Sequence, residues 1–146
     1  MPTAKSYHKD NMKTSYRVAA AILANQGRIL IAKRKQGDRF SGSWEFPGGK
    51  IESGESPEAC LARELLEELG IKIRVDGLFC ESRYACLAYE VELLSYRVTH
   101  LEGEIRLCEH EEIRWIQPSE MDDFEFSLPD VPVVMRLKAE SAAISP

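Results

Sequence analysis

The sequence predicts a single domain of the α/β class, in which strands and helices are mixed along the chain. The length of 146 residues fits one domain, since domains usually hold about 100 to 200 residues. One segment carries the start and stop signals of a helix, and stretches rich in β-branched and aromatic residues lie before and after it. Residues 1–15 are polar and lack an apolar period, so we expect tails at 1–15 and 141–146 and a domain at 16–140.

A hairpin opens the predicted domain. Residues 16–24 form a compact apolar stretch, and the turn-forming residues 25–28 separate it from a second apolar stretch at 29–32. We therefore expect two strands joined by a tight turn. The next elements expected are a loop, a short strand and a second loop, at 33–43, 44–46 and 47–49.

The best-defined element is a helix between Ser56 and Gly70. Ser56 is a preferred N-cap residue, Pro57 suits the first helical position, and Gly70 is a typical stop. Four apolar residues recur at helical spacing and predict the stripe that faces the core: Ala62, Leu65, Leu66 and Leu69. Three acids are expected on the other side: Glu64, Glu67 and Glu68.

Strands and a closing helix complete the predicted domain. Strands are expected at 71–75, 78–83, 87–98 and 113–116 from their β-branched and aromatic content. Turns are expected near 76–77 and 102–103. A short helical turn at 119–123 and a helix at 131–139 follow.

Composition and charge exclude several classes of protein. The longest apolar run, 18–24, has seven residues, whereas a membrane helix needs about 20. No secretory signal is recognisable, so the cytoplasm is the expected location. With 24 acids against 19 bases, the chain lacks the basic excess of proteins that bind polymeric nucleic acid, and a polyanionic substrate would need a metal intermediary. The four cysteines contain no Cys-x-x-Cys pair, which indicates reduced thiols.

The three glutamates of the helix allow two interpretations. Like charges one turn apart destabilise a helix, so something should offset them. One interpretation is a solvated face relieved by Arg63. The other is a magnesium platform, because Mg²⁺ prefers carboxylate oxygens together with substrate phosphates.

The segment upstream decides between these interpretations. Five residues separate Gly49 from Glu55, seven more separate Glu55 from Arg63-Glu64-Leu65, and Glu67-Glu68 and Gly70-Ile71 follow. Over these 23 residues the chain resembles the Nudix box at every defined position. Residues 44–50, Trp-Glu-Phe-Pro-Gly-Gly-Lys, are similar to the MutT-like branch of that family, and the resemblance covers about residues 17–139.

This resemblance implies a fold and an activity. The fold would be the Nudix α/β/α sandwich, with a central mixed β-sheet and a catalytic strand-loop-helix. The activity would be hydrolysis of a modified or pyrimidine (d)NTP to the (d)NMP and pyrophosphate, with Mg²⁺ as cofactor and Mn²⁺ as a substitute. The partner would be a small nucleotide, not polymeric nucleic acid or a membrane, and the protein a monomer or homodimer.

The resemblance also implies residues that hold the metal and activate water. The metal ligands would be the carbonyl of Gly48 and the carboxylates of Glu64, Glu67, Glu68 and Glu109. Glu109 is included because it lies six residues before Trp115, as a later acid does in MutT-like enzymes. Glu55 and Arg63 would form a supporting salt bridge, and Glu64 or Glu109 would deprotonate the water.

A further set of residues is expected to bind the substrate: Arg34, Glu45, Phe46, Tyr89 and Asp130. Arg34 lies eleven residues before Glu45, as does a nucleotide-contacting arginine of the branch, whereas Lys33 and Lys35 are read as surface charges. Asp130 occupies the place of a base-reading Asn or Asp, but it could equally cap the closing helix.

Tyr89 leaves other substrates open. It stands where the guanine-selective branch has an arginine, which argues against selectivity for 8-oxoguanine. It also lies near the position of a tyrosine in Nudix members that cleave dinucleoside polyphosphates. Hydrolysis of dinucleoside polyphosphates or nucleotide sugars is therefore the second hypothesis, and a catalytically silent nucleotide-binding module is the third.

Overall fold

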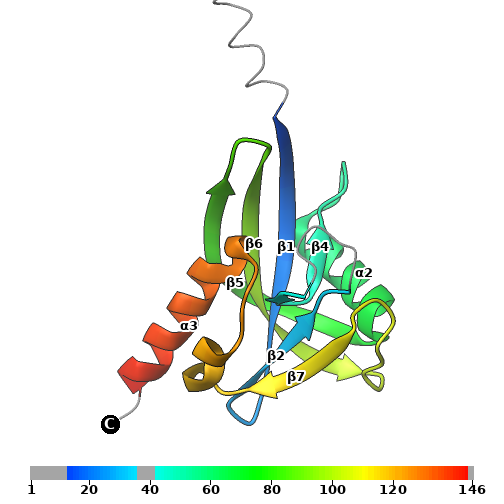
Figure 1. Ribbon diagram of the computed structural model, residues 1–146. Helices are drawn as coiled ribbons and strands as arrows, with labels where there is room; N and C mark the ends of the chain where they lie inside the picture. Colours follow the sequence, from blue (N-terminus) through cyan, green and yellow to red (C-terminus); the bar gives the residue numbers. More distant parts are fainter. Residues whose placement is uncertain (1–12, 36–41, 145–146) are drawn as a thin grey trace, which may run out of the picture.

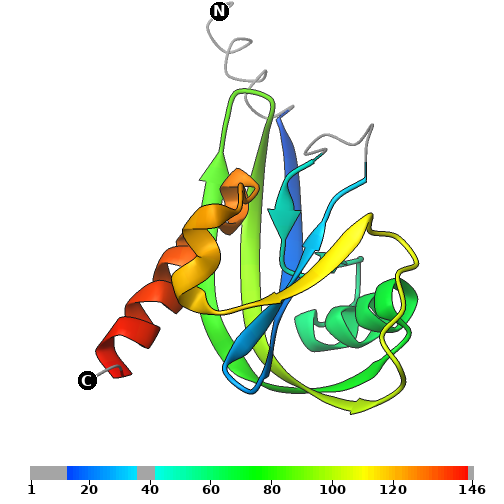
Figure 2. The ribbon, with the colours of Figure 1, turned by 60° about the horizontal axis from the view of Figure 1, so that its bottom comes forward.

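A mixed β-sheet forms the centre of the molecule, and helices cover both of its faces (Figures 1 and 2). The computed structural model describes residues 13–35 and 42–144. Its strands are β1 (Thr14–Asn25), β2 (Arg28–Lys33), β3 (Trp44–Glu45), β4 (Gly48–Lys50), β5 (Lys72–Ala85), β6 (Tyr89–Glu102) and β7 (Glu112–Ile116). Its helices are α2 (Pro57–Leu69), α3 (Val131–Ile144) and the short 3₁₀ helices η1 (Pro118–Asp123) and η2 (Leu128–Asp130).

Strand β1 divides its pairing between several neighbours. It pairs in parallel with β6 along most of its length, and β6 pairs antiparallel with β5. On its other edge, β1 pairs with β2 through Ala24 and Asn25, but with β4 through Val18, Ala19 and Ala20. Strand β2 pairs instead with β3 and β7. Beyond the hairpin turn, β1 and β2 therefore separate.

Both faces of β1 are buried. Ala19, Ala21 and Leu23 belong to the core that packs against α2, whereas Ala20 and Ile22 belong to the core that packs against α3. A strand covered on both faces has no polar face to alternate with its apolar one, which explains the continuous apolar stretch in the sequence. The predicted sandwich with a central mixed sheet is confirmed.

Helix α2 begins and ends where the sequence predicts. The Ser56 hydroxyl accepts a hydrogen bond from the Ala59 N–H at 3.0 Å, and Gly70 closes the helix in the left-handed conformation, with φ of 72°. The predicted stripe is wrong by about one position. Leu61, Leu65 and Leu69 are fully buried and Ala62 and Leu66 are exposed, because the helix is rotated about its axis relative to that expectation.

This rotation also changes the place of one acid. Glu68, expected on the solvated side of α2, is buried among the core-facing residues of the helix. Glu64 is half-buried, and Glu67 remains exposed, with 52% of its side chain accessible. The three acids therefore do not share one environment.

Two strand predictions need correction. Residues 47–49 were expected in a loop, but Gly48 and Gly49 belong to strand β4, which pairs with β1. Residues 76–77 were expected in a turn, but β5 runs through them with register shifts against β6 on either side. These register shifts accommodate the turn-forming residues as a bulge within the ladder. The Asp76 carboxylate also accepts a hydrogen bond from the Thr99 hydroxyl of β6 at 2.6 Å.

The ordered elements extend past the boundaries expected from the sequence. Strand β1 starts at Thr14, and α3 continues to Ile144. Residues 1–12 of the expected N-terminal tail, residues 36–41 of the expected loop and residues 145–146 lie outside the described residues. The domain boundaries therefore stay predictions.

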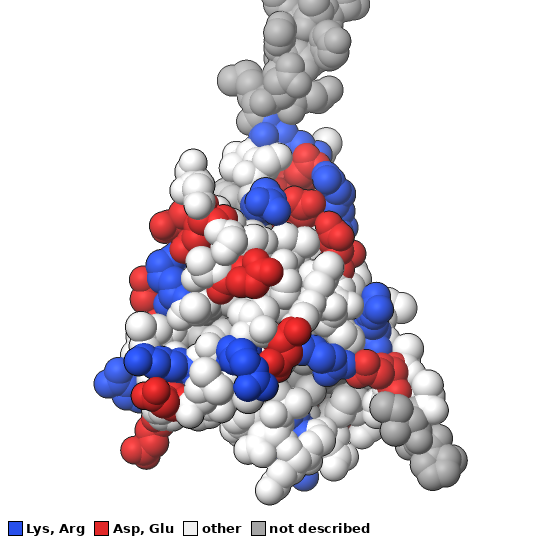
Figure 3. Space-filling model, turned by 180° about the vertical axis from the view of Figure 1, so that it is seen from behind, with Lys and Arg blue, Asp and Glu red and all other residues white. Residues whose placement is uncertain are grey.

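Charge is mixed on the face opposite the view of Figure 1. Figure 3 shows Lys and Arg side chains interspersed with Asp and Glu side chains across this face. Among the described residues, no helix has both the length and the apolar composition needed to cross a membrane. All four cysteines are free thiols, and Cys60 and Cys80 are buried.

Candidate active site

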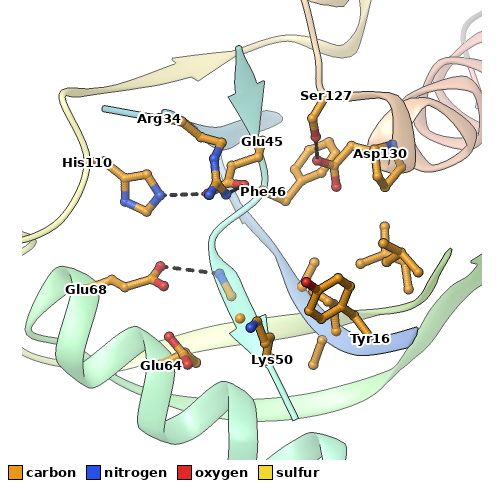
Figure 4. A pocket seen from close by; sticks show the side chains of 18 of the residues that line it. Tyr16, Arg34, Glu45, Phe46, Lys50, Glu64, Glu68, His110, Ser127 and Asp130 are labelled. Carbon is orange, nitrogen blue, oxygen red and sulfur yellow. Dashed lines mark hydrogen bonds and ion pairs between the residues drawn. The ribbon is translucent and has the colours of Figure 1, made fainter. Parts of the chain in front are cut away.

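A cavity of about 890 Å³ opens where β1 leaves β2 and pairs with β4. Residues of β1, β3, β4, β6, α2, η2 and the segment before β7 line it. In the described part of the chain, four of the five buried polar or charged residues line this cavity: Glu68, His110, Ser127 and Asp130 (Figure 4). Burial of such groups costs free energy, so their concentration in one place marks a candidate active site.

Two glycines bring β4 close to its neighbours β1 and α2. A Cβ atom on Gly48 would collide with the carbonyl group of Ala19 on β1, and a Cβ atom on Gly49 would collide with the carboxyl group of Glu64. The Gly48 N–H donates a hydrogen bond to Oε1 of Glu68 at 3.4 Å. The missing side chain of Gly48 therefore allows β4 to approach β1, and that of Gly49 allows the Glu64 carboxylate of α2 to approach the backbone of β4.

Arg63 connects the start of α2 to one of these carboxylates. Its Nε and Nη2 atoms donate to the two oxygens of Glu55, at 2.7 and 2.9 Å. Its Nη1 atom donates to Glu64 at 2.9 Å, and Nη2 also donates to the carbonyl of Lys50 at 3.2 Å. The hydrogen bonds from Arg63 to Glu55, followed by one from the Glu52 backbone, lower the pKa of Glu55 to about 2. Glu64 is thus oriented by a cation that a second carboxylate holds in place.

Glu68 lies in an unfavourable environment for a carboxylate. Burial, followed by the neighbouring Glu64, raises the pKa of Glu68 well above its usual range. Glu45 and Glu109, which also line the cavity, contribute in the same direction. Arg63 pairs with Glu64 and Arg34 pairs with Glu45, but the four carboxyl groups outnumber these two cations, which favours the binding of a further positive charge.

A three-residue network lies beside the carboxylates. Nη1 of Arg34 donates to Oε1 of Glu45 at 2.7 Å, and Nε2 of His110 lies 2.9 Å from Oε2 of the same carboxylate (Figure 4). All three side chains line the cavity. The arrangement holds a guanidinium group within reach of the carboxylate-rich end.

The other end of the cavity is aromatic and apolar. Phe46 stacks on Phe126, with ring centroids 5.4 Å apart, and Tyr89 contacts the ring of Tyr16 with centroids 6.3 Å apart. Asp130 accepts a hydrogen bond from the Ser127 hydroxyl at 2.5 Å. Phe46, Tyr16 and Tyr89 therefore line the cavity together with one buried carboxyl group, that of Asp130.

The environment of Asp130 favours its neutral form. Burial, then the nearby Glu45, raises the pKa of Asp130 to about 8, although the Ser127 hydrogen bond and Arg34 act in the opposite direction. Its described side-chain hydrogen bond is with Ser127 in the preceding turn, rather than with a backbone N–H of α3. Among the described residues, Asp130 therefore makes no capping hydrogen bond to α3.

Comparison with known proteins agrees with this geometry. Residues 13–137 match the family model described as NUDIX domain. The chain belongs to the Nudix family.

Among relatives, this Nudix protein is similar to enzymes that act on nucleotides. It is 33% identical over 126 residues to the CTP pyrophosphohydrolase of Escherichia coli, which covers 86% of this chain and 93% of the relative. It is 33% identical over 130 residues to the 8-oxo-dGTP diphosphatase of Haemophilus influenzae, and this match covers 88% of this chain and 96% of the relative. The solution structure of the E. coli ORF135 protein matches with a TM-score of 0.80 and 31% identity. This match covers 92% of this chain and 96% of the ORF135 chain.

The Nudix box residues take three different positions. Gly48, Gly49, Glu64 and Glu68 line the cavity. Glu55 and Arg63 lie behind them and hold Glu64. Glu67 is not among the cavity-lining residues, and its carboxylate accepts a hydrogen bond from Arg63 at 3.4 Å.

Nudix hydrolases generally need a divalent metal ion, and the donor set suits one. Glu64 and Glu68 provide carboxylate oxygens on adjacent turns of α2, and Gly48 brings the β4 backbone beside them. Oxygen ligands of this kind are preferred by hard divalent cations. Among the described residues, no three potential ligand side chains are already gathered as a complete coordination sphere.

The remaining predicted residues all reach the cavity: Arg34, Glu45, Phe46, Tyr89, Glu109 and Asp130. Other residues line the cavity without having been predicted from the sequence, among them Tyr16, Lys35, Lys50, His110 and Ser127. Lys35 had been read as a surface charge. A signal existed for Lys50, which ends the MutT-like motif, and for His110, which follows Glu109. Tyr16 and Ser127 belong to no motif that would have identified them.

Proposed function

We propose that this Nudix hydrolase cleaves a modified or pyrimidine (d)NTP into the (d)NMP and pyrophosphate, using Mg²⁺, with Mn²⁺ as a substitute. One observation carries the proposal: clustered carboxylates and aromatic side chains line the same cavity, the carboxylates on the side of α2 and the aromatic rings beside Asp130 (Figure 4). A triphosphate needs a cation and the base needs a flat pocket, so the two ends match the two parts of a nucleotide. The relatives named above act on nucleoside triphosphates, which supports the same substrate class.

In this proposal, the metal end consists of Gly48, Glu64, Glu67, Glu68 and Glu109. Mg²⁺ bound there would supply charge neutralisation for the phosphate oxygens. Glu64 and Glu68 already line the cavity, and Glu67 would have to exchange part of its contact with Arg63 for a metal-directed orientation. Mg²⁺ usually keeps several water ligands, so two or three protein oxygens are enough.

Water is the nucleophile in the proposed reaction. It attacks the α- or the β-phosphorus atom of the triphosphate, its proton passes to a carboxylate, and the P–O bond that bridges these two phosphorus atoms breaks, which yields the (d)NMP and pyrophosphate. Glu64 is the favoured base, since Arg63 holds its carboxylate, and Glu109 is the alternative. No nucleophilic side chain is required, because positioning and charge neutralisation dominate this chemistry.

The substrate end completes the proposal. Arg34 would contact the phosphate chain, Phe46 and Tyr89 would border the base, and Asp130 would bond its edge. A neutral Asp130 offers a donor as well as an acceptor, and an ionised one offers acceptors alone. The preferred base therefore depends on the protonation state of Asp130, and a cytosine, with an acceptor and a donor side by side, fits the neutral form.

A panel of natural, oxidised and methylated (d)NTPs, incubated with Mg²⁺, tests the proposal. We expect Mg²⁺-dependent release of pyrophosphate and the matching monophosphate. Release of inorganic phosphate as the primary product, or no consumption of any triphosphate above background, would contradict it. Measurable turnover would also dispose of the silent binding module.

Tyr89 is the observation that favours a second substrate class. It lines the cavity beside Tyr16, where a second base or a sugar could stack. Dinucleoside polyphosphates or nucleotide sugars would then be cleaved faster than triphosphates in a direct comparison of kcat/KM. The cytoplasmic location and the monomeric or homodimeric state belong to the proposal as expectations from the sequence.

A further inference from the structure

His110 is a buried histidine that the proposed reaction does not use. Its side chain is 6% exposed, and its Nε2 atom lies 2.9 Å from Oε2 of Glu45. An ionised carboxylate can only accept hydrogen bonds, so Nε2 carries the proton and donates it. Among the described residues, Nδ1 is buried and has no hydrogen-bond partner. Within the described part of the chain, the hydrogen bond of this ring is therefore the one to Glu45.

Glu45 transmits this contact to Arg34. Its second oxygen, Oε1, accepts from Nη1 of Arg34 at 2.7 Å, so each carboxylate oxygen serves one partner. A terminal carboxylate torsion is soft and has few preferred angles of its own. The hydrogen bond from His110 fixes the plane of the carboxylate and thereby the direction in which Oε1 faces Arg34.

The backbones on either side of this network are already held. Glu45 pairs with Ala32 in the β2–β3 ladder, and the Glu111 N–H donates to the carbonyl of Lys33 at 3.0 Å. Cys108 N–H donates to the carbonyl of Glu68 at 3.2 Å, which ties the same segment to the end of α2. His110 thus approaches Glu45 from a fixed frame.

Arg34 has a long side chain whose rotatable bonds lose freedom when it binds a ligand. This side chain is 26% exposed. A guanidinium group that is already oriented loses less entropy when it binds a phosphate. Arg34 lines the cavity together with the carboxylates of the metal end, so its direction matters for binding the phosphate chain.

We propose that His110 is a positioning residue, which acts through Glu45 to hold the Arg34 guanidinium in place for the phosphate chain of the substrate. This inference rests on the proposed function, since it presupposes a polyphosphate in the cavity. His110 touches neither substrate nor metal in this role. Its effect should therefore appear in substrate binding rather than in the chemical step.

Two substitutions separate positioning from packing. His110→Leu keeps a side chain of similar size but has no N–H group to donate to Glu45. His110→Gln places an amide N–H near the position of Nε2 and can still donate to Glu45. We expect the KM for the best nucleotide to rise about tenfold in His110→Leu with kcat little changed, and to stay within about twofold in His110→Gln.

A double-mutant cycle tests whether the effect passes through Arg34. Arg34→Ala alone should raise KM, and adding His110→Leu should raise it no further. An equal additional rise in both backgrounds would overturn the inference, and so would equal impairment by His110→Leu and His110→Gln. A lowered Tm in His110→Leu with unchanged KM would also overturn it, because the histidine would then serve packing alone.

Calorimetric binding of inorganic tripolyphosphate with Mg²⁺ separates this inference from the proposed function. We expect the order of tripolyphosphate affinities to follow the order of the KM values. The wild type and His110→Gln should bind tripolyphosphate tightly, whereas His110→Leu and Arg34→Ala should bind it weakly. If the wild type bound tripolyphosphate in this order but cleaved no nucleotide, the proposed function would fail and the positioning role would stand. Failure of the wild type to bind tripolyphosphate would overturn the positioning role. Should His110→Leu not fold, His110→Asn, whose amide is too short to reach Glu45, replaces it.

Discussion

Arg63 holds Glu55 through two parallel hydrogen bonds of 2.7 and 2.9 Å, and with its remaining nitrogen it orients Glu64. The pair joins the loop before α2 to the helix itself, so the Nudix box is a structural unit as well as a set of ligands. Glu55 contributes no lining to the cavity; its effect on the proposed chemistry passes through Arg63.

The first prediction concerns the pH dependence that this pair causes. The pKa of Glu55 is lowered from 4.5 to about 2, so its stabilisation is fully present above about pH 4.5 and is lost as the pH falls towards 2. The difference in unfolding free energy between wild type and Glu55→Gln should therefore be largest near pH 6 and should shrink below pH 4.5, as urea unfolding at several pH values would show.

Glu52→Gln is the matched control for this measurement. Its carboxylate also faces Arg63, but at 3.8 Å and with 69% of the side chain exposed. Such an exposed ion pair contributes little to stability. A pH-dependent difference of the same size in Glu52→Gln would mean that Arg63 has no preferred partner.

The second prediction contrasts two adjacent acids of α2. Glu67→Gln and Glu68→Gln should each lower Mg²⁺-dependent turnover by about a hundredfold or more, since each removes a negative oxygen from a hard cation. Stability should respond differently. Glu68 is buried with a raised pKa, so Glu68→Gln should increase the unfolding free energy at neutral pH without metal, whereas exposed Glu67→Gln should leave it nearly unchanged.

Thermal unfolding with and without Mg²⁺ checks this contrast. The metal should raise the Tm of the wild type more than that of either variant. If activity and folding were lost together in both variants, the two acids would be structural.

The third prediction concerns the close approach of β4 to α2. A methyl group at Gly49 would displace the carboxyl end of Glu64, which is a flexible side chain, so Gly49→Ala should fold with a Tm within a few degrees of wild type. Turnover should fall about a hundredfold, because the displaced carboxylate leaves its place beside Arg63. Gly77→Ala is the control, since nothing lies within 4 Å of its added Cβ. Equal losses of activity in the two variants would contradict the prediction.

The fourth prediction concerns Asp130. If this residue bonds the base, Asp130→Ala should cost about 1–3 kcal/mol in transition-state binding for the preferred base and leave the Mg²⁺ dependence intact. Asp130→Asn should be less damaging, because an amide offers both a donor and an acceptor, as the neutral carboxyl group does. The measurement is kcat/KM for the best and second-best nucleotides, together with the Tm of each variant. A capping role would instead lower stability by about 1 kcal/mol with unchanged rate ratios, and Asn would restore it.

Local signals were sufficient where a few neighbouring residues decide the backbone. The hairpin was predictable because Gln26 and Gly27 take the positive φ values, 53° and 80°, that its tight turn needs. The limits of α2 were predictable because Ser56 and Gly70 act within one turn of the helix ends. The spacing of the box residues, set along the chain itself, was sufficient to indicate the family and the acids of the site.

Contacts between distant elements could not be predicted in this way. Asp76 and Gly77 are turn-forming residues, but pairing with β6 keeps them within β5 as a bulge. Gly48 and Gly49 suggest a loop, but β1 offers an open edge to pair with. In both places the ladder hydrogen bonds of the neighbouring strand outweigh the local preference.

The sequence by itself determined the composition of the site: which acids are present, on which helix they lie, and which family pattern they follow. The tertiary structure alone decided which of them is buried, because the rotation of α2 against the sheet turns Glu68 inward and leaves Glu67 in solvent. It also decided that His110 meets Glu45, 65 residues away, and through it Arg34. Helical spacing defines relative angles around a helix axis, and only packing against the sheet defines the absolute direction of each side chain.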